Sequence, residues 1–218
     1  MDLAATLPPT VTLHGIDIEI GLVPDSRPAN CSFSKASITD LPQDWTDTFD
    51  LINQRLLVSA LTTKDWEKAT GEMYRVVKQG GYVQLVEALR IEGGPQSDRA
   101  LEVFTRLHNL RGIPEPSQVE SYTRSMMQGK GFDIVSVQHF DARLGLLAGP
   151  LGKGFRDNWE EIFNTLKTTT FDAGGLGMFA SEAEYDQFVE DAVHEWDTTD
   201  GCKVAFCIIV AQKPKRTD

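Results

Sequence analysis

An aspartate near the N-terminus lies where its carboxylate could bind sugar hydroxyls. Asp17 follows the run His14-Gly15-Ile16, near the end of a β-branched segment, and Ile18 comes directly after it. A carboxylate at the carboxyl end of a parallel strand can accept hydrogen bonds from both hydroxyls of a ribose. Aspartate is also common at strand ends as a turn or helix-cap residue. Asp17 is therefore either a ribose ligand or a turn residue.

Two later segments could meet Asp17 at the same edge of a sheet. Ile38 lies in a loop after the next strand-like run, where an apolar side chain can pack on a purine, although a plain turn fits equally well. Asn53, Gln54 and Arg55 end a third run, and such strand ends bind ligands in parallel sheets. These side chains could face a cofactor or substrate, or Arg55 could only pair with surface carboxylates.

The histidines and cysteines do not indicate a metal centre. The four histidines have no ligand spacing, and the three cysteines form no Cys-x-x-Cys pair. We expect no metal and no disulfide framework. His108, in a predicted helix, could act as a base, but a structural role is favoured. No catalytic residue is identified by its pattern.

The elements that must position these residues alternate along the chain. Short β-branched runs predict strands at 11–18, 31–38, 49–53, 82–87, 132–140 and 204–211. Helical periodicity predicts helices at 64–78, 98–110, 116–128, 157–167 and 181–195. This alternation predicts an α/β fold with a mostly parallel sheet and helices on both faces.

Glycine and charge patterns predict the connections. Gly80 and Gly81 follow the first helix, so we expect a left-handed glycine cap there. The glycine-rich stretches 144–154 and 172–177 are predicted as loops. The basic residues Lys213, Lys215 and Arg216 are expected to form a solvated tail.

A series of motifs in the first 90 residues resembles the class I S-adenosylmethionine-dependent methyltransferases. These are Gly15-Ile16-Asp17-Ile18, Ile38-Thr39-Asp40-Leu41-Pro42, Phe49-Asp50-Leu51-Ile52 with Gln54-Arg55-Leu56-Leu57, Asp65-Trp66, and the stretch from Tyr74 to Glu87. Their order and spacing are most similar to a fungal secondary-metabolism branch that includes LaeA-like regulators. Many relatives have an aspartate at the position of Ser37 and a histidine at that of Asn53.

The resemblance implies a Rossmann-like methyltransferase fold that binds S-adenosylmethionine through Asp17, Ile18, Ile38, Asn53 and Gln54. It also implies that the family's first strand and glycine-rich loop are absent, since residues 1–5 and 7–9 are similar to the end of the helix after that loop. We expect a gap in the sheet with two unpaired edges. The function implied is methyl transfer in secondary-metabolite biosynthesis. A cofactor-free accessory protein that steers a pathway step and a LaeA-like regulator remain alternatives.

Length and charge restrict the partners. The 218 residues fit one domain: residues 1–90 as the cofactor side, 91–200 as the acceptor or lid region, and 203–213 as a terminal strand. The net charge of −11 disfavours nucleic acid and anionic membranes. No run is apolar enough to span a membrane, and no signal peptide is evident. We expect a cytoplasmic protein with a small-molecule acceptor, and as possible partners a biosynthetic enzyme or a second copy.

Overall fold

The computed structural model describes residues 6–8, 10–21, 23 and 26–215, and these form an α/β fold. One sheet has four strands in the order β3-β4-β6-β5: β3 (Phe49–Arg55), β4 (Val77–Glu92), β6 (Lys203–Gln212) and β5 (Asp133–Arg143). A second sheet pairs β1 (Leu13–Asp17) with β2 (Cys31–Lys35) in parallel. All six strands were predicted from sequence, and β4 is much longer than expected.

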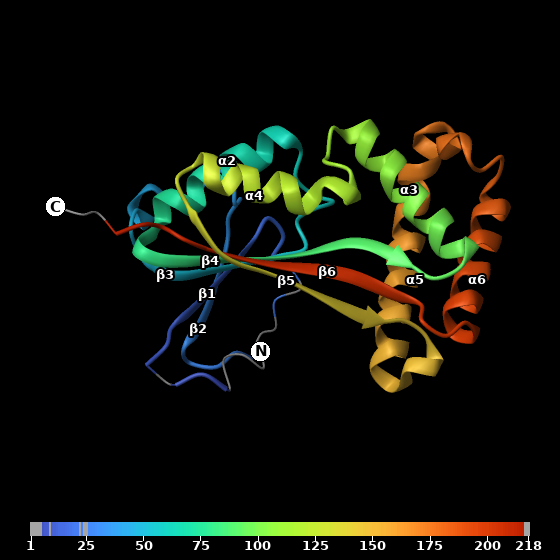
Figure 1. Ribbon diagram of the computed structural model, residues 1–218, viewed down its shortest axis with the longest axis horizontal. Helices are drawn as coiled ribbons and strands as arrows, with labels where there is room; N and C mark the ends of the chain where they lie inside the picture. Colours follow the sequence, from blue (N-terminus) through green and yellow to red (C-terminus); the bar gives the residue numbers. More distant parts are fainter. Residues whose placement is uncertain (1–5, 9, 22, 24–25, 216–218) are drawn as a thin grey trace.

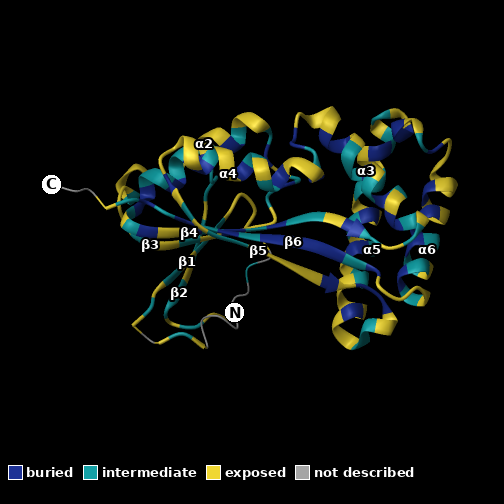
Figure 2. Cartoon of the chain, in the orientation of Figure 1, coloured by how far each residue is buried: buried dark blue, intermediate teal, exposed yellow. Residues whose placement is uncertain are grey.

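Three strands of the larger sheet share one direction. β3 and β4 pair in parallel, whereas β6 is antiparallel to both β4 and β5. The apolar run 204–211 had suggested a strand buried on both faces, and residues Val204 to Cys207 are indeed all buried. Its central place between β4 and β5 explains this burial, although the strand itself runs antiparallel (Figure 2).

Helices cover both faces of the larger sheet, as predicted. α2 (Thr63–Val76) and α4 (Val119–Gly129) lie side by side on one face (Figure 1). Their core contains Trp66, Met73 and Met127 packed with Cys207 and Ile209. The helices α3 (Pro95–Arg111), α5 (Gly149–Asp172) and α6 (Glu182–Thr198) gather at the far end of the long strands.

This second group of helices packs on the opposite face of β6. Its core includes Val204 and Phe206, which alternate along the strand with Cys207 and Ile209 of the first core. Phe163, Phe188 and Trp196 make it strongly aromatic, with ring centroids of Phe163 and Phe188 5.5 Å apart. The fold thus has two cores, one on each side of a shared strand.

Short connections complete the chain. Single 3-10 turns cover Gln43–Trp45, Pro116–Gln118, Leu146–Ala148 and Gly174–Gly177. The predicted loop 172–177 contains the last of these, with positive φ at Gly174, Gly175 and Gly177. The predicted loop 144–154 is wrong in its second half, because α5 begins at Gly149 and Pro150 takes a first-turn position that needs no amide donor.

The expected glycine cap after the first helix is also wrong. α2 ends at Val76, and the next residue, Val77, is already extended with φ −76° and ψ 138°. The pairing of β3 with β4 starts there, at Phe49 and Val77, so strand formation ends the helix. Gly80, with φ +79°, instead serves a bend inside the β4 segment.

Lys213 corrects the prediction of a solvated basic tail. Its side chain is buried, with an ion pair to Asp47 at 2.6 Å. The ammonium also donates to the carbonyl oxygens of Tyr74 and Val77, each at 2.8 Å. Burial is tolerated because these partners satisfy the charge. Arg216 lies outside the described residues.

The two sheets are separate at the point where a gap was expected. β1 and β3 are edge strands, and no described strand pairs with β3 on the side away from β4. Figure 1 shows β1 and β2 on one side of β3 and β4, opposite α2. The expected helix end at residues 1–5 lies outside the described residues. Among the described residues, no helix is long and apolar enough to cross a membrane.

Candidate functional site

A cavity of about 550 Å³ lies between the two sheets. Its walls come from the ends of β1 and β3, the turn after β2, and the segment after β3. All five residues expected to bind a cofactor line it: Asp17, Ile18, Ile38, Asn53 and Gln54. The structure therefore brings together side chains that are up to 37 positions apart in the sequence, as their places at strand ends predicted.

Asp17 is a turn residue with one carboxylate oxygen left over. Oδ1 accepts a hydrogen bond from the amide of Glu19 at 2.9 Å, so the turn interpretation is correct. Among the described residues, Oδ2 has no hydrogen-bond partner, and the side chain is exposed at the cavity. One oxygen thus shapes the turn while the other can accept from a ligand. Ile18 beside it is 68% exposed, so it offers an apolar surface at little desolvation cost.

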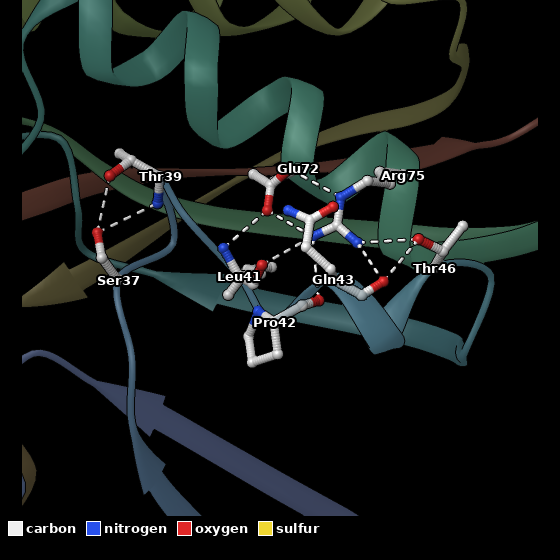
Figure 3. Close-up of polar contacts among 8 residues, drawn as sticks. All are labelled: Ser37, Thr39, Leu41, Pro42, Gln43, Thr46, Glu72 and Arg75. Atoms are coloured by element: carbon white, nitrogen blue, oxygen red, sulfur yellow. Dashed lines mark hydrogen bonds and ion pairs between the residues drawn. The ribbon is translucent and has the colours of Figure 1, made fainter.

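The loop with Ile38 is a tight turn fixed to α2. The Ser37 hydroxyl accepts from the Thr39 amide at 3.2 Å, and Ser37 carbonyl accepts from the Asp40 amide at 3.1 Å. Further along, Glu72 accepts from the Leu41 amide at 2.7 Å, and Arg75 donates to the Leu41 carbonyl at 3.0 Å (Figure 3). The turn interpretation is thus also correct, and the turn holds Ile38 against the cavity.

Glu72 and Arg75 act as a clamp because they pair with each other at 2.6 Å while binding the loop. The Arg75 guanidinium hydrogen bond, together with the amide of Leu41, holds the pKa of Glu72 below its ordinary value, against the effect of burial. Arg75 also donates to the Thr46 hydroxyl at 3.0 Å (Figure 3). The α2 helix that carries this clamp starts with a Thr62–Asp65 capping box.

Trp45 is a cavity residue that the sequence analysis missed. It packs edge-on against His14 and Phe49, with ring centroids 5.0 and 5.3 Å apart. His14 in turn hydrogen-bonds the hydroxyls of Ser32 and Ser34 on β2 at 2.7 and 2.9 Å. All three rings line the cavity. Nothing in the spacing of these residues indicated that they meet, since the contacts cross three separate segments.

Asn53, Gln54 and Arg55 at the end of β3 face different surroundings. Asn53 is exposed and accepts a hydrogen bond from the Gln84 amide at 3.4 Å. Gln54 is buried, and its amide nitrogen donates to the Glu87 carboxylate. Arg55 lines the cavity, and no described carboxylate lies within ion-pair distance of it. Of the two interpretations of Arg55, a surface ion pair is therefore not found among the described residues.

Glu87 is the second residue that the sequence analysis did not single out. It is fully buried on β4, and its carboxylate accepts from the amides of Leu57 and Val58 at 3.2 and 3.0 Å. Burial raises the pKa of Glu87 to about 7, although these amides and Gln54 favour the charged form. Leu56, just before them, has φ +58°, a strained conformation for leucine. Glu87 therefore holds the segment that follows β3.

His108 is placed away from the cavity and is fully engaged by the protein. Nδ1 donates to the Pro114 carbonyl at 2.8 Å, so Nε2 accepts from the Ser59 hydroxyl at 2.9 Å. Burial lowers the pKa of His108, which favours the neutral ring. The side chain joins α3 to the segment after β3 and lines a separate cavity of only about 40 Å³.

Comparison with known proteins shows similarity to methyltransferases. Residues 3–85 match a family model described as a methyltransferase domain. It is 27% identical to the N-methyltransferase gliN of Aspergillus fumigatus, over 91% of this chain and 73% of that protein. It is also 27% identical to the N-methyltransferase verN of Clonostachys rogersoniana, over 99% of this chain and 75% of that one.

A third relative matches a shorter stretch of this chain at a higher sequence identity. The N-methyltransferase sirN of Leptosphaeria maculans is 33% identical over 64% of this chain and 42% of its own length. Among solved structures, the [4+2]-cyclase SpnF has a TM-score of 0.51 at 16% identity, over 94% of this chain and 68% of that one. This likeness shows the fold alone. Because a protein described as a cyclase has this fold, the fold does not decide the reaction.

Proposed function

We propose that the chain binds S-adenosylmethionine in the 550 Å³ cavity and methylates a nitrogen of a small molecule. The observation that carries this proposal is the meeting of Asp17, Ile38 and Gln54 from three different strand ends around one cavity. The names of the related fungal proteins support nitrogen as the acceptor atom. The proposal divides the chain into two parts: residues 1–90 hold the cofactor, and residues 91–200 shape the acceptor region.

The residues present fit such a ligand. The free Oδ2 of Asp17 is placed to accept from ribose hydroxyls, and Ile18 and Ile38 are apolar surfaces for an adenine. The cation of Arg55 can pair with the carboxylate of S-adenosylmethionine. The cavity volume is within the usual range of ligand sites. S-adenosylmethionine bound there supplies a methyl group already activated by its sulfonium. The contribution of the protein is then mainly to align the acceptor nitrogen with that group.

Titration calorimetry with S-adenosylhomocysteine tests the proposal. We expect micromolar binding by the purified chain and a loss of affinity of about tenfold or more in Asp17→Ala, because a charged hydrogen-bond acceptor is removed. Asp50→Ala is the matched control, since Asp50 is exposed near the start of β3, does not line the cavity and pairs with Lys78 instead. It should retain wild-type affinity.

Failure to bind would contradict the proposal. If circular dichroism shows a folded protein that binds no S-adenosylhomocysteine, the cofactor-free accessory role becomes the better explanation. If Asp17→Ala and Asp50→Ala lose affinity equally, the cavity edge at β1 is not the ribose site. If the wild-type protein binds S-adenosylhomocysteine, methyl transfer itself is measured with labelled S-adenosylmethionine and amine-containing small molecules.

A further inference from the structure

Exposed apolar side chains gather in one short stretch of the chain. Of the twelve large hydrophobic residues that are exposed in the described part of the chain, six lie between positions 135 and 155. These six are Val135, Phe140, Leu146, Leu147, Leu151 and Phe155. Single exposed hydrophobic residues are normal on a protein surface, whereas a contiguous group of them marks an interaction site.

Aromatic contacts and helix geometry place four of these side chains in one patch. Phe140 of β5 stacks on Phe206, with ring centroids 4.9 Å apart, and the ring of Phe155 on α5 lies 6.5 Å from the same ring. Leu151 is 81% exposed and lies one helical turn before Phe155, on the same side of α5. Leu147 is in the 3-10 turn that joins β5 to α5. We call Phe140, Leu147, Leu151 and Phe155 the β5 patch.

The outer edge of β5 has free backbone groups beside this patch. β5 is the last strand of the larger sheet, and among the described residues only β6 pairs with it. The Leu144 amide donates to the Cys202 carbonyl at 2.8 Å, so the even-numbered residues of β5 direct their backbone groups towards β6. The register is unbroken from 136 to 143, so the odd-numbered residues there direct theirs outwards. Figure 2 shows the second half of this strand as exposed.

A second copy of β5 has the ends that match this edge. A two-fold axis near Gln138, the middle residue of the strand, places the start of each antiparallel strand beside the end of the other. Asp133 of one copy then lies opposite Arg143 of the other, so opposite charges meet twice. The exposed Val135, near the start of the strand, likewise comes towards the β5 patch of the other copy, which borders the end of the strand.

We propose that β5 and the β5 patch form the interface of a two-fold homodimer, in which the two β5 strands pair edge to edge in antiparallel orientation. This pairing joins the larger sheets of the two copies into one continuous sheet, satisfies the outward backbone groups and removes the patch from water. The net charge of −11 opposes association, but charges more than about 8 Å apart are largely screened at 0.15 M salt. No residue of this interface lines the 550 Å³ cavity.

Two substitutions at one position isolate the backbone contact. Size-exclusion chromatography with light scattering should give the wild type twice the mass of one chain at micromolar concentrations. His139→Pro removes an outward amide and should raise the dimer Kd at least about tenfold. His139→Ala loses the same side chain but keeps the amide, so its Kd should change less than about threefold. Proline is tolerated on an edge strand where its missing amide faces outwards, so β5 should stay paired with β6.

A pair of leucine substitutions tests the β5 patch. Leu151→Glu puts a charge into the interface and should raise the dimer Kd at least about tenfold. Leu110→Glu is the matched control, because Leu110 is also exposed but lies on α3, outside the patch. It should dimerise like the wild type.

Charge reversal tests whether the partner is a second copy in antiparallel orientation. Arg143→Asp places like charges opposite Asp133 of the other copy and should raise the Kd about tenfold. Adding Asp133→Arg restores opposite charges at both ends of the paired strands. The double variant should therefore dimerise more tightly than Arg143→Asp alone.

Each outcome decides for or against the proposal. A wild type that is monomeric up to about 1 mM, or a dimer that both His139→Pro and Leu151→Glu leave intact, overturns it. A double charge reversal that restores nothing overturns the antiparallel two-fold arrangement. Circular dichroism shows which variants are folded, and Leu151→Glu decides alone if His139→Pro is not. Binding of S-adenosylhomocysteine is measured separately, so failure of the dimer leaves the proposed function intact.

Discussion

Two carboxylates hold backbone amides in the two halves of this molecule, and they do so under different conditions. Glu87 on β4 accepts from Leu57 and Val58 beside the cavity, whereas Glu195 on α6 accepts from the amides of Gly94, Gln96 and Ser97 at the start of α3. Burial raises the pKa of Glu87 to about 7. Burial also opposes the charge of Glu195, but its hydrogen bonds hold the pKa below the ordinary value.

The difference shows what each carboxylate contributes. Glu195 is half-buried and sits at a helix N-terminus, where free amides and the helix dipole favour a negative charge, so it stabilises the fold. Glu87 is fully buried and has a high pKa, so its charge costs stability at neutral pH. A costly charge beside a ligand cavity is typical of a functional site, whereas a stabilising one is typical of a structural contact.

The largest effect is expected from the aromatic core of the helical half. Trp196 is fully buried there, and its indole donates to the Ser97 hydroxyl at 3.1 Å. Trp196→Ala should lower the free energy of unfolding by about 4 kcal/mol, because it leaves a large cavity. Urea denaturation measures this loss. Affinity for S-adenosylhomocysteine at low temperature should be unchanged, and a parallel loss of affinity would contradict the independence of the two halves.

The pH dependence of stability tests the cost of the Glu87 charge. Because its pKa in the folded protein is about 7 and the ordinary value is 4.5, the folded state binds the proton more tightly. The contribution of Glu87 to stability is therefore present at pH 4.5 and below and is lost as the pH rises through 7, by up to about 3 kcal/mol. Denaturation at several pH values between 4.5 and 8 should show a flatter profile in Glu87→Gln. If the wild type and Glu87→Gln had the same dependence of unfolding free energy on pH, the charge of Glu87 would not lower stability.

Glu195 should behave in the opposite way. Its pKa in the folded protein is below 4.5, so its contribution is present above that pH and is lost as the pH falls through the folded value. Glu195→Gln should lower the free energy of unfolding at pH 7 by about 2 kcal/mol, because charged hydrogen bonds to the start of α3 are lost. A variant as stable as the wild type at pH 7 would show that the amides are satisfied without the charge.

A third carboxylate, Glu120 on α4, provides the smallest effect. It pairs with His139 of β5 at 2.6 Å, but the His139 side chain is 57% exposed. An exposed polar contact is screened by water, so His139→Ala should change the free energy of unfolding by less than about 0.5 kcal/mol. The same denaturation measurement checks this. A loss above 1 kcal/mol would mean that carboxylate contacts in this protein cannot be ranked by burial.

Local patterns in the sequence determined the α/β class, the strands and helices, and the strand-end places of Asp17, Ile38 and Asn53. They did so because the periodicity of apolar residues and the order of strands are properties of the chain itself. The resemblance to methyltransferases rested on motifs between Gly15 and Glu87, and the match to a methyltransferase domain at residues 3–85 covers nearly all of them. The end of α2, the start of α5 and the burial of Lys213 did not follow from local patterns.

Only the tertiary structure decided the roles of Glu87, Gln54 and Lys213. Glu87 and Gln54 are 33 positions apart, and Lys213 is 166 positions from Asp47. From the sequence alone, a carboxylate at the end of an apolar strand and a lysine near a chain end would both be expected to be exposed to solvent. Whether such a charge is buried depends on which strand pairs beside it, and the free energy of that burial depends on partners supplied by distant segments.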